Sequence, residues 1–204
     1  MENIEYNSVV KHFLKNDKVV FSLLKRFGEE KLSNRKNYFK HLCTSIVGQQ
    51  LSVKSAAAIN KRFLEYFDNK LQPEKIAQTE TEVFRSLGLS GAKSKYVKDL
   101  SQKIVDKTIS LDGISKKSNS EIIKELTKVK GIGPWTVDMF LIFTLGRPNI
   151  LASGDLGIKK AIMLNYDLKK LPTDKNVIRL SKKMNWSPFN SYVMLYLWKS
   201  LDEG

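Results

Sequence analysis

The sequence predicts an all-α protein with about ten short helices, built as one domain whose two lobes flank a cleft. Apolar residues recur at three- and four-residue spacing along most of the chain from Lys11 onward. No segment shows the sustained alternation of apolar and polar residues that is typical of half-buried strands. Glycine, proline and serine interrupt the apolar pattern at short intervals, which favours many short helices over a few long ones.

The first two helices with a clear apolar stripe are joined by a short polar loop. One is predicted over residues 39–47, where the stripe consists of Phe39, Leu42, Cys43, Ile46 and Val47. The other covers residues 56–67 and has Ser52 as its expected N-cap, because a serine hydroxyl can accept from a free backbone N–H of the first turn. Gly48-Gln49-Gln50-Leu51 connects them.

The rest of the chain continues as helices separated by turn residues. Helices are predicted over residues 76–87, 94–105, 120–130, 137–145 and 188–200. One more is expected to begin near Asp155, and Ser187 is expected to cap the last one. Residues 137–145 are apolar almost all round, so we expect that helix to be buried.

The composition is that of a folded and strongly basic protein. At 204 residues, with 42% hydrophobic and 27% charged residues, the chain can build one large domain but not an elaborate multidomain machine. Lys and Arg number 35 against 21 Asp and Glu, which gives a net charge of +14. This surplus favours a polyanionic partner such as nucleic acid; a lysine-rich surface without a ligand is the alternative.

Cysteine and histidine are too scarce for most metal sites. Cys43 is the single cysteine, and one thiol can neither form an intrachain disulfide nor hold an iron–sulfur cluster, which needs about four thiolates. His12 and His41 are the only histidines, and neither belongs to a cluster with zinc-ligand spacing. We therefore expect no metal site made of side chains and a buried, structural Cys43.

Neither end of the chain indicates export or membrane insertion. The N-terminus, Met1-Glu2-Asn3-Ile4-Glu5-Tyr6, has acidic residues and no apolar core of signal-peptide length. No stretch approaches the roughly 18 apolar residues that span a bilayer. We expect no membrane partner and a cytoplasmic location, near the nucleoid if the source is a prokaryote.

A Gly-x-Gly turn lies between an amphipathic and an apolar helix. In Gly131-Ile132-Gly133 the glycines permit positive φ and leave backbone N–H groups uncovered. Such a turn, with a helix N-terminus beside it, can bind a phosphate. Many helix-to-helix turns look like this, so the turn alone is weak evidence; the alternative is that the glycines only shape it.

The surrounding residues make the pattern more specific. Val129-Lys130-Gly131-Ile132-Gly133-Pro134-Trp135-Thr136, with Asp155 following 19 residues after Thr136, resembles the helix-hairpin-helix, Gly/Pro-rich loop and aspartate of the HhH-GPD DNA glycosylase superfamily. The sequence is most similar to the alkylation-repair branch, the 3-methyladenine DNA glycosylase II or AlkA-like proteins. The resemblance extends from the helix before Gly48 to Trp198. It implies the HhH-GPD fold, a DNA-binding cleft and base excision repair.

The resemblance implies two elements that contact DNA. Gly131, Gly133 and Thr136 of the hairpin would meet phosphates next to the lesion. The loop Gly48-Gln49-Gln50-Leu51-Ser52 resembles the family's wedge, which fills the gap left when a base is flipped out of the duplex. Gln50 occupies the best-matched position, whereas Leu51 is the more typical apolar wedge. Further phosphate contacts are expected from Lys54, Lys93, Lys95, Lys159 and Lys160.

The family also implies one monovalent cation. Backbone carbonyls of the hairpin would hold Na⁺ or K⁺, and the matching residues here are Thr127, Val129 and Ile132. No other cofactor is expected.

Asp155 matches the family's catalytic aspartate. Breaking an N-glycosidic bond develops positive charge on the deoxyribose, and a fixed carboxylate stabilises that transition state and can orient the attacking water. The start of a helix also favours an ionised carboxylate. Without the motif, an aspartate here would usually be only a helix cap.

Trp135 predicts a monofunctional enzyme. Bifunctional relatives have a lysine at this hairpin position, which attacks the sugar and then nicks the strand, and an indole cannot form that Schiff base. The resemblance places Trp135, Met139 and Trp198 in the base pocket. Aromatic rings there suit alkylated purines, whose positive charge stacks favourably on electron-rich rings. Met139 replaces an aromatic residue often found there, so the sequence leaves the preferred lesion open.

We expect a monomer that binds double-stranded DNA containing damaged bases. Residues 1–204 would form a single glycosylase domain, with lobe A at about 1–47 plus 176–204 and lobe B at about 48–175. The wedge loop begins too early for the N-terminal β domain that some AlkA-like proteins have. Two other functions stay open: a glycosylase for deaminated or oxidised purines, and a non-catalytic protein that binds damaged DNA.

Overall fold

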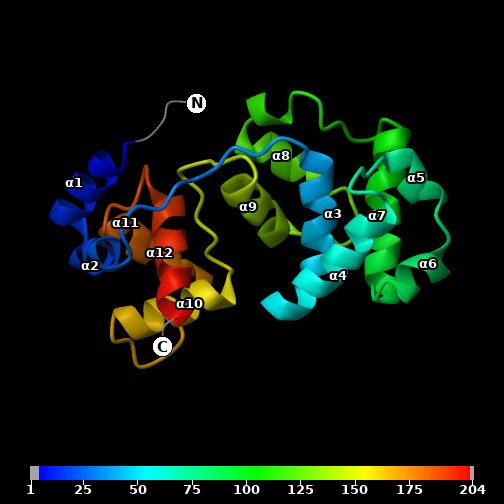
Figure 1. The fold of residues 1–204 in the computed structure, drawn as a ribbon. Helices are drawn as coiled ribbons and strands as arrows, with labels where there is room; N and C mark the ends of the chain where they lie inside the picture. The colour runs from blue at the N-terminus through cyan, green and yellow to red at the C-terminus, as the bar shows by residue number, and fades with distance from the viewer. Residues whose placement is uncertain (1–4, 203–204) are drawn as a thin grey trace. The chain divides into compact units, whose positions relative to one another are not determined.

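The computed structural model describes residues 5–202, and these form twelve α-helices, one 3₁₀ helix and no strand (Figure 1). The predicted all-α class is confirmed. The helices are α1 (Tyr6–Asn16), α2 (Lys18–Phe27), α3 (Tyr38–Gly48), α4 (Val53–Tyr66), α5 (Pro73–Gln78), α6 (Thr81–Ser86), α7 (Gly91–Val105), η1 (Ile114–Lys116), α8 (Asn119–Leu126), α9 (Pro134–Phe143), α10 (Leu156–Asn165), α11 (Asp174–Lys183) and α12 (Asn190–Asp202). Within the described range, no helix combines the length and the apolar character needed to cross a bilayer. Residues 1–4, on which part of the signal-peptide argument depends, lie outside that range.

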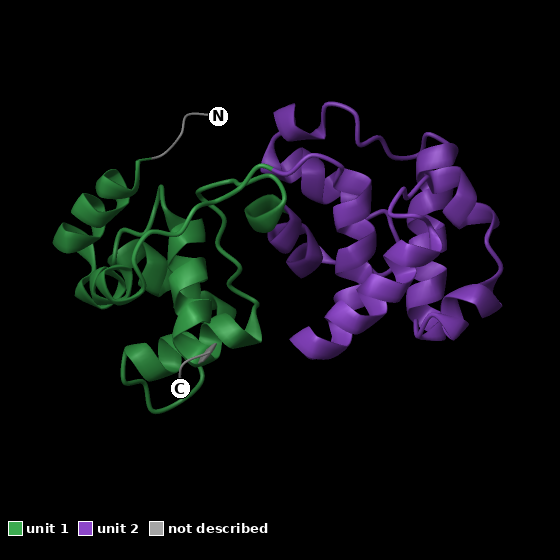
Figure 2. Ribbon diagram, in the orientation of Figure 1, with its two compact units in different colours: residues 1–34, 141–204 green, residues 35–140 purple. Residues whose placement is uncertain are grey.

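The chain divides into two compact units (Figure 2). Unit 1 contains residues 1–34 and 141–204, and unit 2 contains residues 35–140. These boundaries differ from the expected lobe boundaries near residues 47 and 175. The reason is packing: α3 lies against α4 and α7 inside unit 2, and α10 lies against α12 inside unit 1.

Unit 2 is organised around the apolar faces of α3 and α7. The five apolar residues predicted for the stripe of α3 are all buried. Ser52 caps α4 as predicted, with its hydroxyl accepting from the Ser55 N–H. Phe63, Phe67 and Phe84 form an aromatic cluster between α4 and α6, with ring centroids 5.4–6.3 Å apart. Local periodicity thus determines most of this core.

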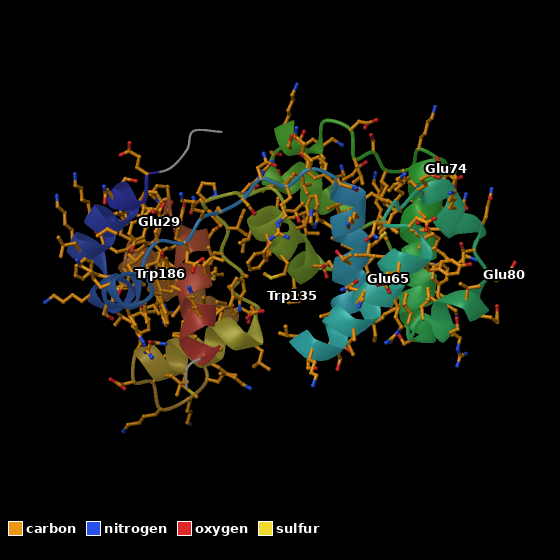
Figure 3. All side chains as sticks on the ribbon, in the orientation of Figure 1. Glu29, Glu65, Glu74, Glu80, Trp135 and Trp186 are labelled. Carbon is orange, nitrogen blue, oxygen red and sulfur yellow. The ribbon has the colours of Figure 1, made fainter. Side chains whose placement is uncertain are left out.

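Unit 1 contains a buried carboxylate among its helices. Asp17 is 2% exposed; its Oδ1 caps α2, and its Oδ2 accepts from the Tyr166 hydroxyl at 2.5 Å and from the Trp186 indole at 2.7 Å (Trp186 is labelled in Figure 3). Four donors therefore compensate the loss of hydration that a buried carboxylate suffers. The network joins the N-terminal segment of unit 1 to its C-terminal segment.

The helix predicted over residues 76–87 is wrong, because the structure has two helices there. Thr79 has an extended backbone at φ −67° and ψ 134°, and its hydroxyl donates to the Lys75 carbonyl at 2.7 Å. The Lys98 ammonium of α7 donates to the Thr79 carbonyl at 2.7 Å. The Thr79 N–H still donates to the Lys75 carbonyl at 3.1 Å, as in a helix, but the Thr79 carbonyl accepts from a side chain of another helix.

Predicted helix starts differ from the observed ones by one to three residues, and α8 and α12 show why. α8 is capped by Ser118 rather than beginning at Ser120, because Ser118 has Glu121 three residues later and forms a capping box with it. α12 begins at Asn190 rather than Pro188, since Phe189 N–H donates to the Trp186 carbonyl in a turn.

Candidate active site

The Gly-x-Gly segment joins α8 to α9 in unit 2. Gly131 has φ +80°, in the left-handed region, and a Cβ on it would collide with the ring of Tyr96 on α7. Glycine is therefore required at 131 by both backbone conformation and space. Gly133 differs, because a Cβ there would meet nothing within 4 Å and its φ is not positive. Nothing in the surrounding protein demands a glycine at 133.

A carboxylate on α7 holds the start of the turn in place. The Lys130 N–H donates to Asp99 Oδ2 at 2.8 Å, and the same carboxylate pairs with Lys103 at 2.8 Å. Burial opposes ionisation of Asp99, but the hydrogen bonds from Lys103 and from the Lys130 N–H outweigh it, so the Asp99 pKa is lowered. An ionised Asp99 thus fixes the start of the turn. Sequence reasoning missed Tyr96 and Asp99, because no motif links them to a turn about 30 residues further along.

The loop after α3 is tied to the same turn. The Gln49 amide donates to the Gly131 carbonyl at 2.8 Å and to Thr136 Oγ1 at 3.2 Å. Gln49, predicted to contact DNA, therefore bridges the loop to the hairpin within the protein. Gln50 and Leu51 at the tip are exposed, and Gln50 has φ +54°.

Two lysines expected to contact phosphates have partners within the protein. The Lys93 ammonium donates to the Val47 carbonyl at the end of α3, at 2.9 Å. The Lys159 ammonium forms an ion pair with Asp174 at 2.6 Å, and this contact lowers the Asp174 pKa. Both side chains therefore have a structural role.

α9 starts directly after the turn. Trp135, labelled in Figure 3, is 43% exposed, whereas Thr136 is 3% exposed and Met139 is half-buried. Asp138 is also half-buried, and burial raises its pKa to about 6. The helix thus begins with an exposed indole, and one turn later it carries a carboxyl group that binds its proton more tightly than an exposed aspartate does.

Asp155 is fixed at the start of α10 in unit 1. It is 8% exposed, and its Oδ1 accepts from the Ile158 N–H at 2.7 Å and from the Trp198 indole at 2.9 Å. The Trp198 ring packs against Phe143 with centroids 5.4 Å apart. The predicted helix start at Asp155 is confirmed, and the structure brings Asp155 and Trp198 together.

The predicted site residues therefore fall into two groups. Unit 1 holds Asp155 and Trp198; unit 2 holds the loop, the hairpin and the start of α9, including Trp135 and Met139. Among the described residues, no group of three or more His, Cys, Asp or Glu side chains could hold a metal ion.

The braced Gly-x-Gly hairpin and the helix-capping aspartate are the two elements on which the resemblance to helix-hairpin-helix DNA glycosylases depends. Residues 43–188 match the model of the family described as HhH-GPD superfamily base excision DNA repair protein, and the chain belongs to this family.

Individual relatives agree with this assignment. YfjP of Bacillus subtilis is 35% identical over 164 residues, which are 77% of this chain; the chain spans 56% of the length of YfjP. DNA-3-methyladenine glycosylase 1 of Schizosaccharomyces pombe is 31% identical over 91% of this chain and 82% of its own length. The solved structure of the S. pombe 3-methyladenine DNA glycosylase Mag1 in complex with abasic DNA is 31% identical, covers 96% of this chain and 97% of its own, and superposes with a TM-score of 0.86.

Proposed function

We propose that this protein is a monofunctional DNA glycosylase that hydrolyses the N-glycosidic bond of alkylated purines of the 3-methyladenine type. The observation that carries the proposal is the placement of Asp155, which is almost fully buried yet held in one orientation by two N–H donors. The names of the S. pombe relatives support the substrate class.

In the proposed reaction, Asp155 acts on charge that develops in the sugar. As the bond to the base breaks, its electron pair leaves with the base and the deoxyribose gains oxocarbenium character. A carboxylate that is already fixed stabilises this charge without reorganising at the moment of reaction. Water then bonds to the anomeric carbon and releases a proton to the solvent, which leaves an abasic site and a free base.

The hairpin is the proposed phosphate contact on double-stranded DNA. Gly133 supports this, because nothing inside the protein requires a glycine there, whereas close approach of a phosphate to its N–H would. The exposed Gln50 and Leu51 are suited to enter the base stack, and Gln49 ties their loop to the hairpin.

The backbone carbonyls of Thr127, Val129 and Ile132 are the proposed ligands of a monovalent cation. Neutral carbonyl oxygens suit such an ion and have two lone pairs each; the Val129 carbonyl uses one of them to accept from the Ile132 N–H at 3.1 Å. The cation would add positive charge beside the DNA phosphate. Trp135 and Met139 on α9 and Trp198 on α12 remain the residues proposed to select the base.

The test is release of free bases from methylated duplex DNA, identified by chromatography, for the wild type, Asp155→Asn and Asp167→Asn. Asp167 is an exposed aspartate of the same unit and serves as the matched control. We expect the wild type and Asp167→Asn to release methylpurines and Asp155→Asn to release none while still binding DNA.

Strand scission distinguishes the monofunctional reaction. Treated DNA should break only after alkali, because Trp135 cannot form a Schiff base. Release of hypoxanthine or oxidised purines in preference to methylpurines would show that the substrate class is different. No release of base from any substrate would contradict the proposal that the protein is an enzyme.

A further inference from the structure

We infer that Trp198 and Gly157 are positioning residues for Asp155: the Trp198 indole N–H fixes the orientation of the carboxylate, and the missing side chain of Gly157 lets the indole reach it. This inference rests on the proposed function of Asp155. It assigns Trp198 a role in addition to its proposed part in selecting the base.

Two hydrogen bonds from different helices converge on one oxygen. Asp155 Oδ1 accepts from the Ile158 N–H of α10 at 2.7 Å and from the Trp198 indole of α12 at 2.9 Å. The capping bond restrains the carboxylate from its own helix. The second donor approaches the same oxygen from α12, and together the two bonds fix the plane of the carboxylate.

Gly157 provides the space for this approach. A Cβ at position 157 would lie 3.1 Å from Asp155 Oδ1 and 3.3 Å from both Cδ1 and Nε1 of Trp198. These distances are shorter than ordinary van der Waals contact, so a methyl group would push on both partners of the hydrogen bond.

Neither Asp155 nor Trp198 can move aside without losing another contact. Asp155 is anchored by its capping bond, and the Trp198 ring packs against Phe143 at a centroid distance of 5.4 Å with 34° between the ring planes. Gly157 has no positive φ, and alanine is the better helix former, so the close approach of the indole is the physical reason for glycine here.

The first test compares Trp198→Phe and Gly157→Ala with the wild type. Phenylalanine keeps an aromatic ring but has no N–H to donate. We expect the single-turnover rate of base release to fall by about 10- to 100-fold in both variants. Affinity for abasic DNA should stay within about twofold, because the lost interaction acts on Asp155 rather than on DNA binding.

A matched control exists in the other unit. Gly91 is also in the first turn of a helix, α7, but a Cβ there would meet nothing within 4 Å. Gly91→Ala should keep the wild-type rate. If Trp198→Phe keeps the wild-type rate, or loses only substrate affinity, Trp198 acts as a stacking surface and the inference is overturned.

A second test needs no activity. The chain has three tryptophans, so its ¹⁵N–¹H spectrum contains three indole N–H signals, and Trp198→Phe identifies one of them. We expect Asp155→Ala and Gly157→Ala to shift that signal and to speed its exchange with solvent. The Trp186 signal should stay in place, because its N–H is bound to Asp17.

An unchanged Trp198 signal in Asp155→Ala would show that the hydrogen bond is absent and would overturn the inference. A wild type that shows this bond but releases no base from any substrate would instead contradict the proposed function. The two failures are therefore distinguishable.

Discussion

Asp138 on α9 offers a quantitative test of the electrostatics of unit 2. It is half-buried, burial raises its pKa from 3.8 to about 6, and no hydrogen bond or ion pair reaches it from the described residues. At pH above 6 the folded protein must hold an ionised Asp138 that the unfolded chain would hydrate better. We therefore expect Asp138→Asn to be more stable than the wild type at neutral pH.

The magnitude follows from the shift. About two pKa units correspond to about 3 kcal/mol, and partial exposure reduces the expected gain to about 1–2 kcal/mol at pH 7–8. The folded state binds the proton more tightly, so the penalty is absent below the unfolded pKa of 3.8, grows between pH 4 and 6, and is complete above pH 6. The stability gain of Asp138→Asn must vary with pH in the same way.

The assay is urea denaturation of the wild type and Asp138→Asn at each pH unit from 4 to 8. Asp112 is an exposed aspartate of the same unit, and Asp112→Asn should change the free energy of unfolding by less than about 0.5 kcal/mol at any pH. A stability difference between Asp138→Asn and the wild type that is the same at pH 4 and pH 8 would refute the reasoning.

Three further predictions concern stability and reactivity. Cys43 is fully buried and burial raises its pKa, so the native protein should not react with a thiol reagent at pH 8, whereas the protein in urea should react at once. Gly131→Ala should destabilise the protein by about 1–3 kcal/mol in urea titrations, because a Cβ collides with Tyr96 at a positive φ; no loss would mean that the ring moves aside freely. Asp17→Asn should cost about 2–4 kcal/mol, since an amide cannot accept from every donor around it; thermal melts followed by tryptophan fluorescence would measure the loss, and an unchanged melting temperature would contradict it.

Features set by local sequence were predictable. The buried stripe of α3 and the caps Ser52 and Asp155 depend on residues within one or two helical turns. The division of residues 76–87 into α5 and α6 depends on a hydrogen bond from Lys98, which lies 19 residues beyond Thr79. α11 has no counterpart among the predicted helices, because most of its residues are polar and its apolar stripe is short.

The same distinction holds for the site. The motif located the hairpin and Asp155, whereas the partners that hold them came from elsewhere in the chain. Gln49 meets the Gly131 carbonyl across 82 residues, and Trp198 meets Asp155 across 43. A sequence motif indicates which groups react, but the side chains that orient them become visible only when distant segments meet.

Unit 1 consists of two segments that are far apart in the sequence, so it can form on the ribosome only after the second segment has been synthesised. Residues 35–140 are one continuous stretch, so unit 2 can fold while residues 141–204 are still being synthesised, which takes on the order of 10 s. During that time α1 and α2 lack α12, the partner on which α2 packs, and the apolar faces that bury Phe13 and Leu24 stay exposed. Asp155 is synthesised soon after the hairpin, but its hydrogen bond to Trp198 can form only when the last residues of unit 1 have been added.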